Sequence, residues 1–188
     1  SIVDFGCGPG HDLVGFSEFS NPSSLIGVDV SSTSLAEAGQ RLKLHRKSVE
    51  LIKIEAEDAC LPIEDNSIDY IHCSGVLMHL KSPVQVLSEF FRVLKDDGSI
   101  RLMVYNHDSL WLHLYVAHVL KGADVRYARL SIEEAFARST DGFDCPISGK
   151  WTPDEMTDLS SQVGFSCRHL GNAVSLFELS LLPQRFSA

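Results

Sequence analysis

The sequence predicts an α/β fold in which the strands of a mostly parallel sheet alternate with helices. Three observations support this prediction. The apolar run Ile2–Phe5 passes directly into a glycine-rich loop, a second apolar run at 24–29 ends in an acid, and two further strand-like runs, 49–54 and 67–74, are interleaved with segments of helical periodicity. With 188 residues and 44% hydrophobic content, the chain fits one domain with a sizeable core.

The loop after the first strand carries glycines at positions 6, 8 and 10. Glycine allows a positive φ and lets the backbone approach a ligand closely. A dinucleotide fingerprint needs G-x-G-x-x-G, whereas this chain has G-x-G-x-G and places His11 where the third dinucleotide glycine belongs. No Gly-Lys-Ser/Thr follows, so the loop is not a P-loop. A plain Gly/Pro turn is the alternative, but it seldom has the whole pattern of residues 2–10.

The acid that closes the second strand is Asp29, nineteen residues after Gly10. This distance is close to the spacing of about 20 that separates a glycine loop from a ribose-binding acid. A carboxylate can accept hydrogen bonds from both ribose hydroxyls, and such bonds are stronger than neutral ones. The alternative is an acid at a helix start, next to Ser31 and Ser32.

The string Asp-Phe-Gly-Cys-Gly-Pro-Gly at 4–10 resembles the first motif of class I methyltransferases that use S-adenosylmethionine. The resemblance implies that the acid and the glycines cradle the amino-acid end of the cofactor, and that a helix over 11–19 directs its free N–H groups at the cofactor carboxylate. It also implies that Asp58 accepts the adenine amino hydrogens while the next N–H donates to the ring. A solvated acidic turn is the alternative for Asp58 and the interpretation we prefer for Glu55 and Glu57. The implied cofactor-binding residues are Asp4, Gly6, Cys7, Gly8, Gly10, His11, Asp29, Val30, Asp58, Ala59 and Ser74.

The resemblance continues through the middle of the chain. A strand at 67–74 is followed by the segment 75–80, a loop that in this family usually lies beside the transferring methyl group. His79 in this loop is either a base or a structural residue that ties the turn to the sheet. A helix beginning at Ser82-Pro83 and a strand at 99–105 extend the resemblance to about half of the chain, with an architectural role.

The family pattern fades at 106–150, where we expect an inserted cap region on the substrate side. Five of its residues, Leu110, Trp111, Leu114, Tyr115 and His118, lie near helical spacing, and a second helix is predicted after the Ser131/Glu134 capping box. The same apolar stripe is also explained by a buried core helix or a dimer face.

In the C-terminal part, the sequence predicts a helix from Thr152 and two neighbouring strands, at 166–170 and 174–182. These strands resemble the antiparallel hairpin of the methyltransferase sheet. The expected architecture is therefore a Rossmann-like seven-stranded sheet, mostly parallel with an antiparallel C-terminal hairpin and with helices on both faces. We expect a single methyltransferase domain over 1–188 that lacks the N-terminal helical segment usual in the family.

Charge and composition favour a small-molecule partner. The formal net charge is −9, and the only basic cluster, Arg41, Lys43, Arg46 and Lys47, is expected to be a solvated helix face, so nucleic acid and anionic membrane are disfavoured. Five cysteines without a C-x-x-C pair suggest neither a disulfide framework nor a zinc site and fit the cytoplasm. No apolar run approaches the roughly 20 residues of a membrane span. We expect a monomer or homodimer.

Methyl transfer from a sulfonium is an in-line displacement with an activated donor, so alignment and exclusion of water are the main requirements. No metal is needed, and a base is needed only for an acceptor that is protonated at neutral pH. His79 and His107 are the candidate bases, with Tyr105 close by, whereas the remaining five histidines after His11 are expected to be ordinary surface or packed residues. The alternatives are a cofactor-binding or regulatory module without turnover and, less favoured by the glycine spacing and the predicted hairpin, a nicotinamide-dependent oxidoreductase.

Overall fold

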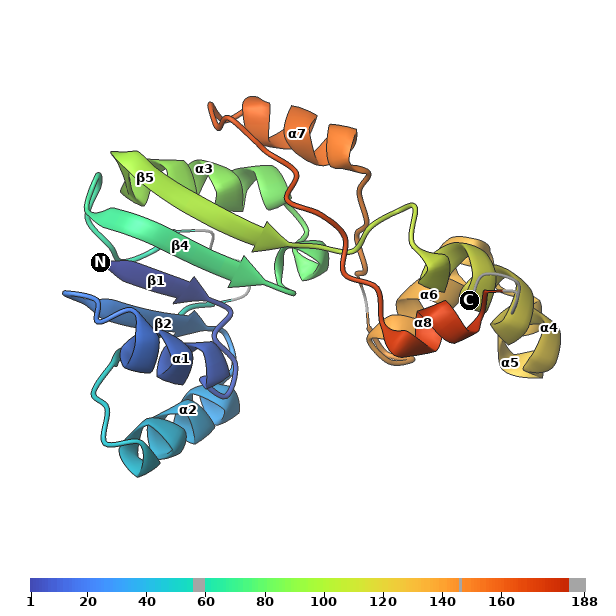
Figure 1. Cartoon of the computed structure of the whole chain (residues 1–188), viewed down its shortest axis with the longest axis horizontal. Coiled ribbons are helices and arrows are strands. Elements are labelled where there is room, and N and C mark those ends of the chain that lie inside the picture. The colour runs from blue at the N-terminus through green and yellow to red at the C-terminus, as the bar shows by residue number, and fades with distance from the viewer. Residues whose placement is uncertain (56–59, 146, 183–188) are drawn as a thin grey trace. The chain divides into compact units, whose positions relative to one another are not determined.

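The computed structural model describes residues 1–55, 60–145 and 147–182, and the chain forms two compact units (Figure 1). The first, called here the sheet unit, comprises Ser1–Leu77, Ser82–Val104 and Ser160–Phe165. The second, called the helical unit, comprises Met78–Lys81, Tyr105–Leu159 and the residues from Ser166 onward.

Within the described ranges, the sheet has five strands, all parallel, in the order β3-β2-β1-β4-β5. The strands are β1 (Ile2–Phe5), β2 (Leu25–Asp29), β3 (Glu50–Lys53), β4 (Ile68–Ser74) and β5 (Leu94–Met103). The strand order reverses between β1 and β4, and in open α/β sheets ligands bind outside the carboxyl ends of the strands at such a point. The predicted parallel core is confirmed, although β5 begins earlier than expected, because Leu94 already pairs with Ile68 ahead of a register shift.

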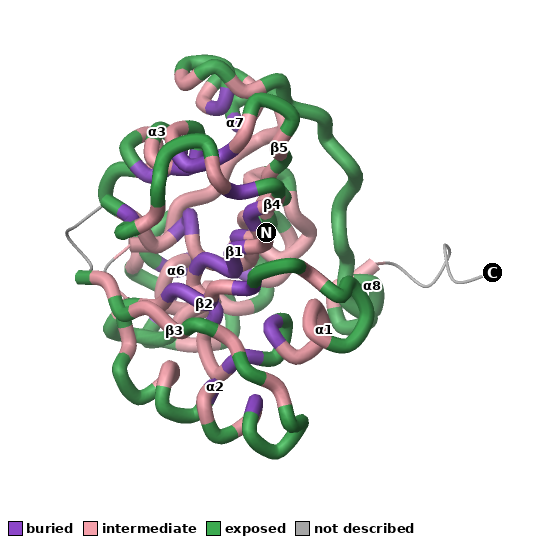
Figure 2. The backbone as a smooth tube through the Cα atoms, turned by 90° about the vertical axis from the view of Figure 1, so that its left-hand side faces the viewer, coloured by how far each residue is buried: buried purple, intermediate pink, exposed green. Residues whose placement is uncertain are grey.

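Helices cover both faces of this sheet, as predicted. On one face lie α1 (His11–Phe19) and α2 (Ser32–Leu44), which bury Leu13 and Leu42 against Leu25 of β2. On the other face, α3 (Pro83–Val93) packs Phe90 edge-on against Phe5 of β1, with ring centroids 4.9 Å apart. Figure 2 shows the resulting concentration of buried residues along the central strands and α3. Successive side chains of β1 point to opposite faces of the sheet, so they face different helices.

Two charged side chains of α3, Glu89 and Arg92, hold the segment 60–67 that precedes β4. Arg92 on α3 donates to the carbonyls of Leu61 and Ile63, at 3.0 Å each, and pairs with Glu89 and Asp65. Glu89 in turn accepts from the Leu61 N–H at 2.6 Å. The guanidinium group of Arg92 thus satisfies carbonyls of residues 60–67, which are described and form no helix. This contact gives a physical basis for the architectural role expected of the segment beginning at Ser82.

The helical unit has a separate apolar core made by Leu112, Val116, Tyr127, Ala135 and Phe136. Its helices are η2 (Trp111–Leu120, a π-helix), α4 (Lys121–Ala123), α5 (Val125–Ala128), α6 (Ile132–Thr140) and α8 (Leu176–Ser180), while η1 (Leu77–His79) and α7 (Pro153–Ser161) run across the boundary between the units. The predicted Ser131/Glu134 capping box starts α6. In the described part of the chain, no helix is long and apolar enough to cross a membrane.

The predicted C-terminal hairpin, and with it the seven-stranded sheet, is wrong for the described residues. The segment 166–170 is irregular and exposed, and 174–182 contains the helix α8 in place of a strand. Ser175 and Glu178 form a reciprocal capping box that starts this helix. Phe177 packs against the rings of Trp111 and Tyr115, at 5.9 and 5.2 Å, instead of adding to a sheet face.

Candidate functional site

The glycine loop lies at the carboxyl end of β1 and depends on all three of its glycines, which have φ angles of 75°, 51° and 80°. A Cβ on Gly6 would lie 2.1 Å from Cγ2 of Val76, and one on Gly10 would lie 2.9 Å from the Cβ of Ala38. A Cβ on Gly8 would meet no atom of the described residues within 4 Å. Gly6 and Gly10 therefore permit close packing inside the protein, while Gly8 borders the open space that a ligand can approach.

Backbone hydrogen bonds fix the loop against the neighbouring strand. The N–H groups of Gly6 and Cys7 both donate to the carbonyl of Val28, at 2.7 and 3.0 Å. Arg41 of α2 donates from Nε to the carbonyl of Pro9 at 2.8 Å. These contacts hold the loop in its binding conformation before any ligand arrives, which lowers the entropic cost of binding.

Asp29 at the end of β2 joins the loop to the start of α2. Its Oδ2 accepts from the Gly8 N–H and its Oδ1 from the Ser31 N–H, both at 2.8 Å. Ser31 is then the residue that caps α2, because its side chain accepts from the Ser34 N–H. Each carboxylate oxygen of Asp29 keeps a lone pair, so the helix-start and ribose-binding roles are compatible.

Asp4 is the most unusual group of the site. Its side chain lies within the sheet unit with only 2% of the residue exposed, and Oδ2 has no hydrogen-bond partner among the described residues. Burial, reinforced by the negative charges of Asp12 and Asp29, raises the pKa of Asp4 to about 7. A buried carboxyl without a partner is costly, and a cationic ligand group placed against it would remove that cost.

Two residues beside Asp4 were missed by the sequence analysis, which treated His72 as ordinary and gave Asp12 no role. His72 on β4 is the register partner of Asp4 on β1, so both side chains point to the α1 face of the sheet. Nε2 of His72 lies 3.5 Å from Oδ2 of Asp12, in the first turn of α1. The available signal for His72 was positional: Asp4 and His72 lie on the two strands that flank the reversal of strand order, but the pairing register was needed to align them.

The other predicted cofactor residues are placed as follows. His11 is the exposed first residue of α1, Val30 is exposed just after β2, and Ser74 is the last residue of β4. The Cys7 side chain packs into the core with Leu13 and Leu25, and burial raises the pKa of its thiol to about 12. Asp58 and Ala59 lie outside the described residues.

The predicted catalytic residues belong to the helical unit, where His79 and Tyr105 meet around Asp141. The Tyr105 hydroxyl donates to Oδ1 of Asp141 at 2.6 Å, and Nε2 of His79 lies 3.6 Å from the same oxygen. Nδ1 of His79 lies 3.0 Å from the carbonyl of Ile147. Burial and the hydrogen bond to Asp141 raise the pKa of Tyr105 well above its usual range, so the phenol stays protonated near neutral pH.

His107 is not part of this cluster. Its Nδ1 lies 3.2 Å from Oδ1 of Asp108, and its ring lies 5.9 Å from that of His113. The side chain is 43% exposed. Sequence proximity to Tyr105 therefore did not bring the two predicted catalytic side chains together.

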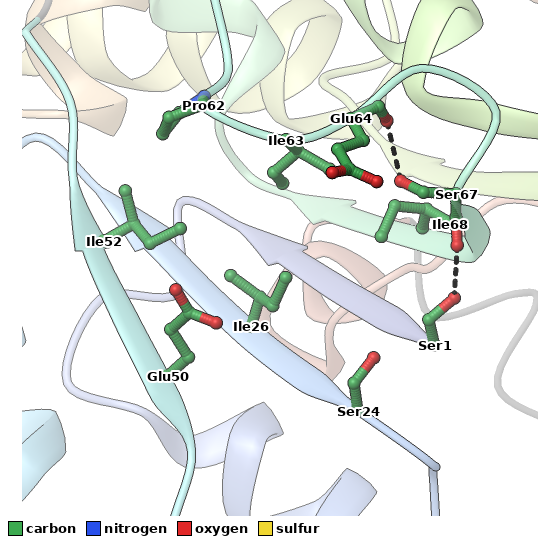
Figure 3. Close-up of a pocket in the computed structure, with 10 residues that line it drawn as sticks. All are labelled: Ser1, Ser24, Ile26, Glu50, Ile52, Pro62, Ile63, Glu64, Ser67 and Ile68. Carbon is green, nitrogen blue, oxygen red and sulfur yellow. Dashed lines mark hydrogen bonds between the residues drawn. The ribbon is translucent and has the colours of Figure 1, made fainter.

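A pocket of 330 Å³ opens elsewhere in the sheet unit, beside the amino ends of the strands (Figure 3). Its walls are mostly isoleucine, with two glutamates and three serines at the rim. The lining residues are Ser1, Ser24, Ile26, Glu50, Ile52, Pro62, Ile63, Glu64, Ser67 and Ile68. Because ligands of open α/β sheets bind at the carboxyl ends of the strands, the glycine loop and not this pocket defines the functional site.

Comparison with known proteins identifies the family. The methyltransferase domain family matches residues 3–102, more than half of the chain. The chain belongs to this family, the class I methyltransferases that depend on S-adenosylmethionine.

Individual relatives agree with this assignment. An uncharacterized methyltransferase of Schizosaccharomyces pombe is 35% identical over 108 residues, which are 53% of this chain and 37% of the relative. The demethylmenaquinone methyltransferase of Lactococcus lactis is 34% identical over 112 residues, 58% of this chain and 44% of the relative. The chain thus spans less than half the length of these relatives. A solved S-adenosylmethionine-dependent methyltransferase of Thermotoga maritima superposes with a TM-score of 0.60 at 20% identity, covering 88% of this chain and 63% of that one.

The residues of the site fit S-adenosylmethionine. The unpartnered Asp4 suits its ammonium group, the open side of Gly8 leaves room for it, and Asp29 keeps acceptor capacity for the ribose. The cofactor is S-adenosylmethionine, as the resemblance of residues 4–10 to the first methyltransferase motif implied.

The contrast between the loop glycines predicts different outcomes for alanine at each position. Gly8→Ala should lower the free energy of unfolding by about 1 kcal/mol, the scale of a positive φ in a non-glycine residue. Its methyl group would enter the open space, so affinity for S-adenosylmethionine should fall at least about tenfold. Gly10→Ala should lower the free energy of unfolding by about 3 kcal/mol, because it adds a clash with Ala38.

The matched control is Gly15→Ala within α1, where an added Cβ has open space and the φ is not positive. This change should stabilise by about 0.5 to 1 kcal/mol and leave cofactor affinity unchanged. Urea unfolding and calorimetric titration measure the two quantities. Normal cofactor affinity in Gly8→Ala would show that the ligand does not approach the loop at this residue.

The raised pKa of Asp4 predicts how stability depends on pH. In the unfolded chain the carboxyl ionises near its ordinary value of 3.8, but in the folded protein it ionises at about 7. The folded state therefore holds the proton more tightly, and Asp4 increasingly destabilises the protein as pH rises from 3.8 to 7, by at most about 4 kcal/mol. Asp4→Asn should be more stable than the wild type at pH 8, with the difference vanishing towards pH 4.

Urea unfolding without cofactor between pH 4 and 8 measures this difference. Asp96→Asn, which changes an exposed acid of β5, is the control and should follow the wild type. Parallel stability curves for the wild type and Asp4→Asn would contradict a raised pKa of Asp4.

Proposed function

We propose that this protein transfers the methyl group of S-adenosylmethionine to a small-molecule acceptor by in-line displacement. The observation that carries the proposal is the glycine loop, which β1, β2 and α1 position together with an unpartnered Asp4 and a loop-anchored Asp29. The bound cofactor supplies a sulfonium-activated methyl group. The chain contributes by binding the cofactor and the acceptor, by orienting them and by excluding water.

In this proposal, each element of the site holds a different part of the cofactor. Asp4 holds the ammonium group, and the N–H groups of the first turn of α1 face the carboxylate, because the first amides of a helix have no partner within it. Asp29 accepts from the ribose hydroxyls while it keeps its bonds to Gly8 and Ser31. The arrangement fixes the donor, so the acceptor needs only to be brought into line.

The charge distribution supports a small-molecule acceptor over a nucleic acid. Besides the net charge of −9, two cations of the one basic cluster are engaged inside the sheet unit. Arg41 holds the Pro9 carbonyl, and Lys47 donates to the Ser17 carbonyl at 3.2 Å and lies 3.4 Å from Glu18. A phosphate backbone would have to compete with these contacts. The similarity to a demethylmenaquinone methyltransferase also supports a small acceptor.

The experiment that tests the function is a calorimetric titration of the protein with S-adenosylmethionine, S-adenosylhomocysteine and NAD, followed by methyl-transfer assays on a panel of small acceptors. Binding of the first two ligands alone and transfer to an acceptor are expected. Asp29→Ala should weaken S-adenosylmethionine binding by more than about tenfold, the scale of a lost charged hydrogen bond. Unchanged affinity would remove Asp29 from the site. Cofactor binding without transfer to any acceptor would favour the alternative, a cofactor-binding or regulatory module without turnover.

A second test concerns the base. If His79 or His107 takes a proton from the acceptor, replacement by alanine should lower kcat and remove the acidic limb of its pH profile between pH 6 and 9. Tyr105→Phe should leave that profile unchanged, because the phenol remains protonated throughout this range. Intact turnover and profile in both histidine variants would exclude an imidazole base and indicate an acceptor that needs none.

A further inference from the structure

Three ionisable side chains from three different elements converge next to the glycine loop. Asp4 comes from β1, Asp12 from the first turn of α1 and His72 from β4, and one ligand atom from each lies within 4.8 Å of the others. The group is graded in exposure: Asp4 is buried, the His72 side chain is 18% exposed and that of Asp12 is 62% exposed. It therefore leads from solvent to an unpartnered carboxylate oxygen.

The hydrogen bonds of His72 define its part in the group. The Tyr70 hydroxyl lies 3.4 Å from Nδ1 of His72, and Nε2 faces Asp12. With the phenol donating to Nδ1, the ring proton sits on Nε2 and points at the Asp12 carboxylate. Phe16 of α1 packs edge-on against the His72 ring, with centroids 5.4 Å apart. His72 is thereby fixed in a position from which it orients Asp12.

We propose that Asp12 and His72 complete, with Asp4, the site for the α-ammonium group of S-adenosylmethionine, and that filling this site expels a proton from Asp4. The inference rests on the proposed function. It assigns Asp12 as a second anion for the ammonium group and His72 as the residue that positions Asp12. The exchange balances: a neutral Asp4 carboxyl and the ligand ammonium give a carboxylate–ammonium pair and one proton, which passes to solvent. No other co-reactant is needed.

The surrounding charges determine the sign of the pH dependence. Asp12 and Asp29 act on Asp4 from α1 and β2, and both oppose its ionisation. Cys7, Tyr70 and Cys73 are neutral thiols or phenols with pKa values raised mainly by burial. On the β4 side, Arg101 of β5 is a positive group and is the register partner of His72, which is itself the register partner of Asp4.

Below about pH 7 the ligand must therefore displace the Asp4 proton. Affinity should rise with pH and level off above 7.

The experiment uses two ligands that differ in the amino-acid group. S-adenosylhomocysteine carries the ammonium, whereas 5′-methylthioadenosine keeps the adenosine part and lacks it. Each is titrated calorimetrically into the full chain at pH 6, 7 and 8, in phosphate and in Tris, so that the buffer dependence of the heat counts protons. For the wild type, we expect S-adenosylhomocysteine to bind about tenfold more tightly at pH 8 than at pH 6 and to release about one proton at pH 6. Binding of 5′-methylthioadenosine should show neither effect.

Variants then show which side chains contribute to ligand binding and to proton release. Asp12→Asn and His72→Gln should each weaken S-adenosylhomocysteine binding about fivefold at pH 8, as expected for a partly exposed charge contact, without changing 5′-methylthioadenosine binding. Asp4→Asn should abolish proton release. Glu18→Gln, which removes an exposed acid from the same helix α1, is the control and should behave as the wild type.

The outcomes separate this proposal from the function on which it rests. If S-adenosylhomocysteine fails to bind the wild type at any pH, the proposed function itself fails. If it binds, but Asp12→Asn and His72→Gln bind it normally and no proton is released, the function stands and this inference is overturned. A metal site at these residues would also overturn the inference. It would be indicated if Zn²⁺ alone binds the wild type, does not bind Asp12→Asn, and is displaced by S-adenosylhomocysteine.

Discussion

The burial of one carboxyl group without a partner is the constraint on which the functional end of this protein depends. Asp4 lies on the first strand, beside the turn into the glycine loop, and its Oδ2 has no partner among the described residues. Such a group costs free energy, and the surrounding structure holds it there through parallel pairing with β2 and β4 and through packing of α1. Under the proposed function, this arrangement is a preformed site for the ammonium group of the cofactor, and it is maintained at the expense of stability without ligand.

The glycine loop shows how much of such a site is encoded locally. The glycine spacing and the acid nineteen residues beyond were sufficient to predict a ligand loop, and the resemblance of residues 4–10 to a known family supplied the class of ligand. The reason is physical: the positive φ angles at three alternate residues favour glycine at these positions whatever the rest of the chain does. The position of Asp29 at the end of a strand was likewise predictable, because this acid closes an apolar run. These features depend on local backbone geometry and on the order of the elements.

Contacts between segments distant in the sequence could not be predicted in the same way. His72 became significant only when the pairing of β4 with β1 placed it beside Asp4, and a shift of one residue would have pointed it to the opposite face. Asp141, which joins His79 and Tyr105, lies after α6 in a segment with no family pattern. The C-terminal hairpin failed for a related reason. Alternating apolar residues fit a strand, but a Ser175/Glu178 capping box and the aromatic contacts of Phe177 favoured a helix.

Asp29 illustrates why the competing interpretations of single residues in this sequence need not exclude one another. One oxygen accepts from the loop at Gly8 and the other accepts from Ser31 before α2, so the same side chain fixes both walls of the site. A ribose bound to the remaining lone pairs would add to a carboxylate that is already oriented by the protein, and little conformational entropy would be lost on binding. A structural role and a ligand-binding role reinforce each other here. Loss of the carboxylate would therefore weaken cofactor binding in two ways, through the missing acceptor and through a loop that is no longer tied to the strand beside it.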